Sequence, residues 1–190
     1  MNIFILDESP GCAARQHCDK HVVKMIIEAA QMLSTAHRVL DGTEYQDKTR
    51  NGRRIKRWRL NENDDRFYKG VHVNHPCTIW TRQSKQNYEW HYDLFTSLCD
   101  EYTYRYGKVH ETDRKLRELL KEPPKNIGDS GFTEWPQCMP DYCKDKNVIE
   151  AYRNYYRHEK KDFAVWTTRK TPTWFSGINN TKSKLYGINI

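Results

Sequence analysis

Four side chains in the first part of the chain could do chemistry together. They are two imidazoles, an amine and a carboxylate, at His17, His21, Lys24 and Glu28. On a single helix this spacing would place all four on one stripe. An acid, a base and two histidines on one face suit acid–base catalysis. The alternative is a solvated helix face on which Lys24 and Glu28 form an ordinary i, i+4 ion pair.

A strongly basic run follows this segment. Residues 48–59, KTRNGRRIKRWR, contain seven Lys or Arg residues and no acidic residue. Cations at this density suit a nucleic-acid backbone, and the tryptophan could stack on a base or a ribose. The alternative is an exposed loop that binds nothing specific, although an unneutralised run repels itself. The candidate contacts in this run are Arg53, Arg54, Lys56, Arg57, Trp58 and Arg59.

A small polar cluster lies just before Pro76. It contains His72, Asn74 and His75, whose imidazoles and amide could hydrogen-bond a base or orient a carboxylate. Asn74 could equally cap the N-terminus of the helix that Pro76 begins. The sequence leaves both roles open.

Zinc binding is another use for histidine and cysteine. His17, Cys18 and His21 could act with Cys138 and Cys143, but the sequence has no close CxxC pair. On a helix, Cys18 would also point about 100° away from His17. A Walker loop, a GxGxxG motif, a nucleophile elbow and a DxD-type carboxylate cluster are all missing from the sequence. We therefore expect no metal and no cofactor.

Composition favours one soluble domain with a polyanionic partner. The chain has 190 residues, a net charge of +7, and 6 Trp, 12 Tyr and 6 Phe, which supply enough large apolar rings for a core. It has neither an apolar run long enough to span a membrane nor a basic segment typical of an export signal. The six cysteines are then expected to be free thiols in a reducing compartment, the cytoplasm of the producing or host cell.

Apolar spacing predicts a mainly α fold. Residues 41–70 lack a long period and are expected to form a loop, as are residues 122–146, which are rich in turn signals. Residues 2–6 could be a strand or an extended arm, and residues 176–190 a flexible tail. The expected architecture is a compact single-domain helical bundle with long ordered loops over residues 1–190. The expected helices span residues 13–40, 76–106, 112–121 and 147–166.

Four segments, in order along the chain, resemble the pyrimidine dimer DNA glycosylase family, to which phage endonuclease V belongs. HVVKMIIEAAQML from His21 is similar to the family's first helix, in which a histidine precedes the catalytic glutamate by seven residues. NGRRIKRWRL from Asn51 is similar to a basic segment after that helix. HVNHPCTIW from His72 and TPTWF from Thr171 resemble later segments. This chain is longer than the phage enzyme, mainly over residues 108–146.

The resemblance implies a mechanism and assigns its residues. In the family, the N-terminal α-amine attacks C1′ of the damaged nucleotide, expels the base and forms an imine, and β-elimination then breaks the strand. Glu28 would be the catalytic carboxylate and Met1 the amine, since Asn2 is too large for removal of the methionine to be expected. Amines of this class titrate near pH 8, well below lysine. The first segment must therefore fold back so that Met1 reaches Glu28.

The implied partner is double-stranded DNA, bound by a monomeric glycosylase with abasic-site lyase activity on damaged or modified pyrimidines. The alternatives are a glycosylase for a hypermodified base, a non-catalytic basic DNA-binding protein and a zinc-stabilised interaction module. The DNA contacts expected outside the basic run are Lys20, His21, Lys24, Asn74, His75 and Trp174.

Overall fold

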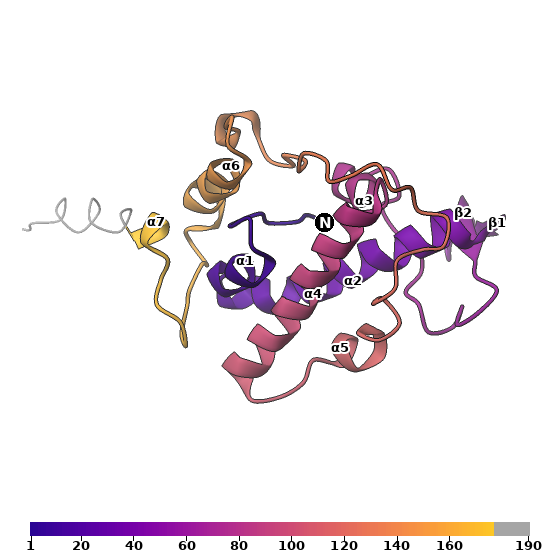
Figure 1. Cartoon of the computed structure of the whole chain (residues 1–190), viewed down its shortest axis with the longest axis horizontal. Helices are drawn as coiled ribbons and strands as arrows, with labels where there is room; N and C mark the ends of the chain where they lie inside the picture. Colours follow the sequence, from indigo (N-terminus) through magenta and orange to yellow (C-terminus); the bar gives the residue numbers. More distant parts are fainter. Residues whose placement is uncertain (177–190) are drawn as a thin grey trace, which may run out of the picture.

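Two long helices cross at the centre of the fold, α2 (Asp19–Asp41) and α4 (Lys85–Tyr106) (Figure 1). The computed structural model describes residues 1–176, so most of the expected tail lies outside the described residues. The apolar positions that predicted α2 are all buried, which confirms its core-facing stripe. They are Val22, Ile26, Ala29, Leu33 and Ala36.

The expected single helix over residues 13–40 is wrong at its beginning. A separate short helix, α1 (Pro10–Gln16), ends at His17, whose extended backbone separates it from α2. Long-range contacts fix the new start, because the Asp19 N–H donates to the carbonyl of Val165 and the Asp19 carboxylate accepts from the N–H and hydroxyl of Thr167. His17 and His21 therefore do not share one continuous helix.

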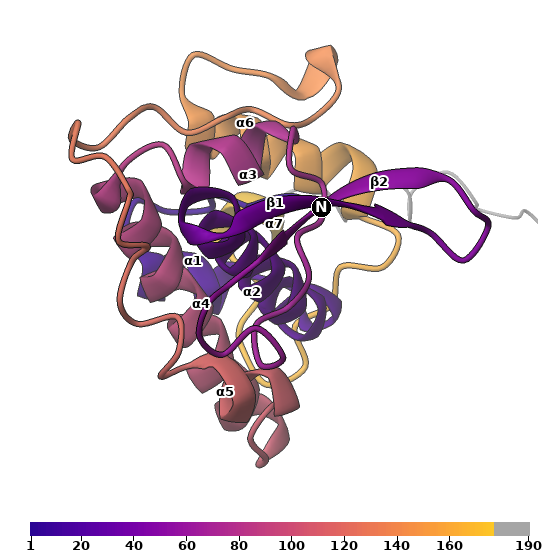
Figure 2. The same ribbon diagram turned by 90° about the vertical axis from the view of Figure 1, so that its right-hand side faces the viewer.

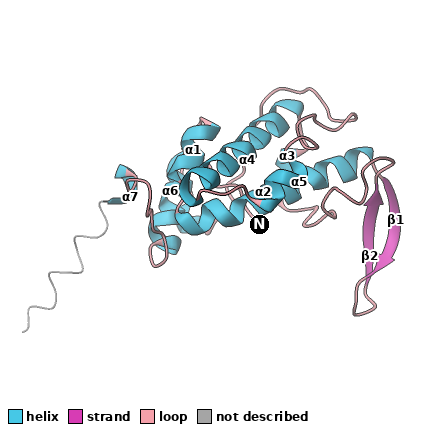
Figure 3. Ribbon diagram, turned by 90° about the horizontal axis from the view of Figure 1, so that it is seen from below, coloured by secondary structure: helices cyan, strands magenta, loops and turns pink. Residues whose placement is uncertain are grey.

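The loop expected at residues 41–70 contains a β-hairpin. Strands β1 (Thr43–Lys48) and β2 (Arg54–Arg59) pair antiparallel, with Thr43 opposite Arg59 and Lys48 opposite Arg54. Gly52 lies in the turn with φ of 77°, a conformation that favours glycine. The hairpin extends away from the helices as an arm (Figures 2 and 3).

The helix expected at residues 76–106 is divided in two. α3 (Pro76–Thr81) ends before Ser84, which caps α4 by accepting a hydrogen bond from the N–H of Asn87. The predicted end at Tyr106 is confirmed, because Gly107 adopts the left-handed conformation that closes a helix. The expected helix is interrupted because Ser84 caps the start of a new helix.

The second half of the chain contains short helices joined by irregular segments. The expected cap at Asn147 is confirmed, since its side chain accepts from the N–H groups of Ile149 and Glu150. The helical residues after it end near Lys160, short of the expected residue 166. The elements are α5 (Glu111–Leu116), η1 (Asp141–Cys143), α6 (Val148–Tyr155), the π-helical turn η2 (Tyr156–Lys160) and α7 (Thr173–Ser176).

The irregular stretch between α5 and η1 is held against the helices by side-chain contacts. Asp41 accepts from the N–H groups of Lys125 and Asn126, and Asn87 accepts from the N–H of Thr133. This packing brings residues near 138 to the start of α3.

The N-terminal segment is a buried extended arm. Ile3, Phe4, Ile5 and Leu6 lie in the core without pairing as a strand. The chain begins in the middle of the molecule, where Figure 1 marks the N-terminus. Among residues 1–176, none of the helices combines the length and apolarity that crossing a bilayer requires.

Candidate active site

The N-terminal amine and the carboxylate of Glu28 lie next to each other. The nitrogen of Met1 is 3.7 Å from Oε2 of Glu28, and the Asn2 N–H donates to the same oxygen at 2.9 Å. The other oxygen, Oε1, lies 3.1 Å from Nζ of Lys24. The expectation that the first segment folds back to Glu28 is therefore confirmed.

Asn2 anchors the terminus. Its Oδ1 accepts hydrogen bonds from its neighbour Ile3 and from the hydroxyl of Tyr152, while its Nδ2 donates to the carbonyl of Cys138 at 2.8 Å. A buried amide with this many partners has one preferred orientation. The position of the preceding amine is fixed by the same contacts.

Part of the main chain of Met1 is nevertheless exposed. Met1 as a residue is partly exposed, although its side chain is only 3% exposed, so most of its exposed surface belongs to the main chain. The side chain of Glu28 is 13% exposed and that of Lys24 is 64% exposed. Glu28 is thus partly shielded but not sealed among aliphatic side chains, and it can both hold charge and exchange protons.

His75 adds a neutral imidazole near this pair. Partial burial lowers its pKa, and the nearby N-terminal amine and His72 lower it further, while Glu28 opposes them. Nδ1 of His75 accepts from the N–H of Cys77 and caps α3, a role that the sequence gave to Asn74 as an alternative to nucleic-acid contact. Asn74 itself is exposed and is not the cap.

The two histidines of the proposed catalytic stripe are core residues. Burial lowers the pKa of His17 to about 4 and that of His21 to about 3. His17 bonds the carbonyl of Ala13, and His21 bonds the hydroxyl of Tyr156 and packs on Phe4. Both are neutral at pH 7, and burial contradicts the expected DNA contact by His21.

The basic run lies on the hairpin and is partly neutralised by the opposite strand. Lys56 pairs with Glu44 at 2.9 Å, and Arg57 pairs with Asp47 at 3.6 Å. At the tip, Arg53 and Arg54 are exposed and, among residues 1–176, have no carboxylate within 4.0 Å. The free positive charge is therefore concentrated at the tip.

Trp58 belongs to the base of the hairpin. It is half-buried and, with Arg57, Tyr45 and Tyr68, lines a pocket of about 680 Å³ that does not include the amine or Glu28. Arg59 is exposed and lies over the ring of Tyr45. This pocket could accommodate a planar group, but its position separates it from the amine–carboxylate pair.

The two remaining residues predicted to contact DNA, Lys20 and Trp174, differ in how exposed they are. Lys20 is exposed, with its ammonium 5.3 Å from the ring centre of Phe163. Trp174 is half-buried, donates to Oε1 of Gln16 at 2.6 Å, and has the guanidinium of Arg157 over its ring. It lies on α7, at the opposite end of the molecule from the hairpin (Figures 1 and 3). Its contacts are those of a packing residue.

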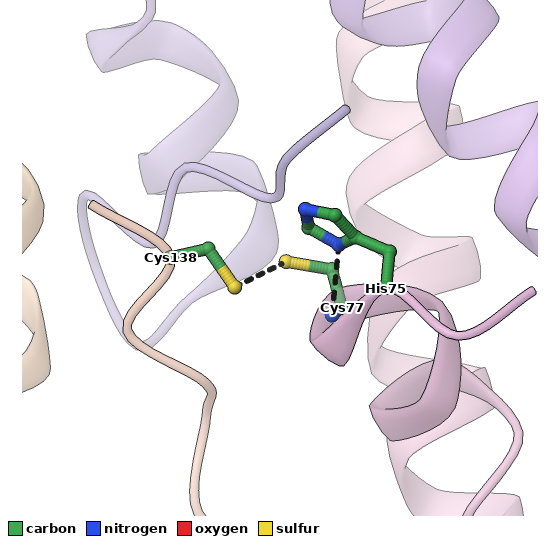
Figure 4. A group of neighbouring side chains, drawn as sticks. All are labelled: His75, Cys77 and Cys138. Carbon is green, nitrogen blue, oxygen red and sulfur yellow. Dashed lines mark hydrogen bonds between the residues drawn. The ribbon is translucent and has the colours of Figure 1, made fainter. Parts of the chain in front are cut away.

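The sequence analysis missed a second cluster. His75, Cys77 and Cys138 converge beside Asn2, with one potential ligand atom from each within 4.8 Å of the others (Figure 4). Among residues 1–176, these three form the only group of three or more His, Cys, Asp or Glu side chains whose potential ligand atoms lie this close together. It differs from the zinc set that the sequence suggested, which was His17, Cys18 and His21 with Cys138 and Cys143.

Comparisons of the chain with models of protein families, with curated proteins and with solved structures find no match. The function of the chain is therefore inferred from its own residues and their geometry.

Proposed function

We propose that this mainly α domain is a monomeric DNA glycosylase with associated abasic-site lyase activity, acting on damaged or modified pyrimidines in duplex DNA. The observation that carries the proposal is the α-amine of Met1 at 3.7 Å from Glu28. An anchored amine beside a carboxylate supplies a nucleophile and a proton-transfer group in one place.

The amine performs the covalent steps. Its lone pair attacks C1′ of the nucleotide as the bond to the base breaks, and the base leaves with the bonding electrons and takes up a proton. Loss of the amine proton and opening of the sugar give an imine. Removal of a proton from C2′ then expels the 3′ phosphate by β-elimination, which breaks the strand.

Glu28 supports each of these steps. Its carboxylate stabilises the positive charge that develops on the sugar and then on the imine. It also accepts and returns the protons that imine formation and β-elimination require. Its two oxygens already face the amine and Lys24, so little reorganisation is needed.

Loss of the first methionine would preserve this geometry. The nitrogen of Asn2 is 2.9 Å from Oε2 of Glu28, so an amine at residue 2 would also contact the carboxylate. The proposal therefore requires a free amine at the start of the chain and not methionine itself.

The exposed cations supply DNA binding. Arg53, Arg54 and Arg59 on the hairpin, with Lys20 and Lys24 on α2, would contact phosphates. Extruding a nucleotide costs a few kcal/mol and costs least at a lesion that already weakens stacking. Positive charge on the projecting hairpin could hold the DNA backbone while one nucleotide is rotated out of the duplex.

Borohydride trapping tests the proposal. The full chain is incubated with an abasic duplex and with a panel of damaged and hypermodified pyrimidine duplexes, and borohydride reduces any imine to a stable adduct. We expect an adduct with the free N-terminus and none when a short extension blocks it. Undiminished strand cleavage by the blocked protein would contradict the imine mechanism, and DNA binding without any adduct would support a non-catalytic protein.

A further inference from the structure

A compact set of potential soft-metal ligands lies beside Asn2. The sulfur atoms of Cys77 and Cys138 are 3.5 Å apart, and a ring nitrogen of His75 completes a group within 4.8 Å (Figure 4). His75 and Cys77 come from the start of α3, whereas Cys138 comes from the irregular stretch before η1. Three potential ligands therefore converge from two segments.

The spacing suits a tetrahedral metal ion. Zinc binds cysteine sulfur at about 2.3 Å and histidine nitrogen at about 2.0 Å, so two sulfurs on one zinc ion lie roughly 3.8 Å apart. The observed separation of 3.5 Å needs only a small rotation to match. Two thiolates and one imidazole favour zinc over the hard cations magnesium and calcium, which prefer oxygen ligands.

The two thiols already share a proton at the position that a metal would occupy. The Cys77 thiol donates a hydrogen bond to the sulfur of Cys138 at 3.5 Å. A zinc ion would displace the shared proton and bind both sulfurs as thiolates.

The cluster encloses the residue that positions the amine. Oδ1 of Asn2 accepts from the Cys77 thiol at 3.4 Å, and Nδ2 of Asn2 donates to the Cys138 carbonyl at 2.8 Å. Linking Cys77 to Cys138 would join the two segments that hold Asn2 between them. An ion here would therefore fix the arm whose first nitrogen lies beside Glu28.

We propose that His75, Cys77 and Cys138 bind one zinc ion, with water in the fourth tetrahedral position, and that this ion fastens the N-terminal arm against α3. The site differs from the zinc set that the sequence suggested, and it adds a metal where the sequence predicts none. It does not depend on the proposed DNA chemistry.

Metal content and cobalt spectroscopy test the site. The full chain is purified under reducing conditions, its zinc is measured by elemental analysis, and the ion is then exchanged for Co²⁺. We expect one zinc per chain, together with the thiolate-to-cobalt charge-transfer and visible bands of a tetrahedral Co²⁺ site. Absence of stoichiometric metal in the wild-type protein would overturn the proposal.

Matched variants separate this site from other thiols. Cys138→Ser and His75→Gln should weaken zinc binding at least about tenfold, because removing a ligand costs no less than removing one of the groups that support it. Cys12→Ser, a partly exposed thiol on α1, should bind zinc like the wild type. Cys77 is fully buried, so Cys138 is the safer position for substitution.

Thiol counting distinguishes zinc from a disulfide between the same two sulfurs. With zinc bound, the partly exposed Cys138 should be protected from alkylation, and chelation should restore its reaction, whereas the buried Cys77 is counted after denaturation. If two thiols are lost to oxidation while added zinc never binds to the reduced chain, the pair is a redox couple and the zinc assignment is wrong. None of these measurements involves DNA, so the zinc site and the proposed glycosylase activity can fail separately.

Discussion

The N-terminal site and the β-hairpin use charge in opposite ways. At the site, the amine, Glu28 and Asn2 hold one another in a fixed network, with Asn2 only 8% exposed. On the hairpin, Arg53 and Arg54 stand in solvent, away from any fixed partner among residues 1–176. The first arrangement suits chemistry that depends on position, and the second suits binding that depends on charge density.

The difference predicts two separable kinds of mutant. Changes at the N-terminal site should slow the reaction while DNA affinity stays nearly unchanged. Changes at the hairpin tip should weaken affinity and its salt dependence, while the rate at saturating DNA stays nearly unchanged.

Replacement of the carboxylate should have the largest effect. Glu28→Gln keeps the size of the side chain but removes its charge and its capacity to accept a proton, so single-turnover strand cleavage should slow by about 100-fold or more. DNA affinity measured by fluorescence anisotropy should change less than about threefold. Glu28→Asp, which retains the charge, should recover part of the rate, and equal cleavage by wild type and Glu28→Gln would remove Glu28 from the chemistry.

Neutralising the hairpin tip should come next. In the triple variant Arg50→Gln, Arg53→Gln and Arg54→Gln, the slope of log affinity against log salt should fall by about 0.9 for each phosphate that the protein no longer neutralises. Affinity should drop roughly tenfold or more at low salt, whereas the rate at saturating DNA should not change.

The matched control removes three exposed lysines elsewhere, at Lys85, Lys108 and Lys121. If this control lowers affinity and salt dependence as much as the hairpin variant does, DNA binding depends on net charge and the hairpin has no special role.

Acid should destabilise the core and spare the hairpin, which contains no histidine. Burial lowers the pKa of His17 and His37 to about 4 and that of His21 and His91 to about 3. The unfolded chain takes up these protons near pH 6.5, so the free energy of unfolding should be highest above that pH and fall as pH drops toward 4.

Urea denaturation at pH 7.5 and 4.5 measures this loss, which should amount to several kcal/mol at about 1.4 kcal/mol per pKa unit. His21→Phe should reduce the difference between the two pH values, whereas the hairpin variant should show the full wild-type difference. An equal free energy of unfolding at both pH values would contradict the burial of these histidines as neutral groups.

The smallest effect is expected at Lys24. Its ion pair with Glu28 is an exposed i, i+4 contact, worth only a few tenths of a kcal/mol. Lys24→Gln should therefore leave stability nearly unchanged and retain the borohydride adduct within about threefold of the wild-type yield. Loss of the adduct in this variant would make Lys24 the nucleophile in place of the N-terminal amine.

The buried face of α2 could be predicted from sequence because its apolar spacing matches its packing. The interruption before it could not, since the start at Asp19 depends on Val165 and Thr167, about 150 residues away in the chain. The predicted stripe was right for Lys24 and Glu28. It was wrong for His17, which lies outside α2, and for His21, which lies on α2 but is buried against Phe4 and Tyr156.

The hairpin was not predicted because none of its strand residues is fully buried and most are exposed. Its strands therefore carry no alternation of apolar and polar residues, which is the usual signal for a strand. The Asn51–Gly52 dipeptide was the available signal, since this pair favours turns between antiparallel strands. Recognising it would have placed Glu44 and Asp47 opposite the basic residues.

The Met1–Glu28 pair and the Cys77–Cys138 pair also differ in whether the sequence could predict them. Met1 and Glu28 could be connected through the family resemblance, which requires an amine beside a carboxylate. Cys77 and Cys138 could not, because they lie 61 residues apart and Cys138 belongs to a segment without periodicity. Only the packing of that segment on α3 and α4 brings the sulfurs together.

Mapping the trapped adduct tests the central claim most directly. After borohydride reduction on an abasic duplex, the protein is digested and the modified residue is located by mass spectrometry. The amine beside Glu28 predicts that the sugar remnant is attached to the N-terminal nitrogen, at Met1 or, if the methionine is removed, at Asn2. Attachment to a lysine side chain, with the N-terminal peptide unmodified, would contradict the mechanism.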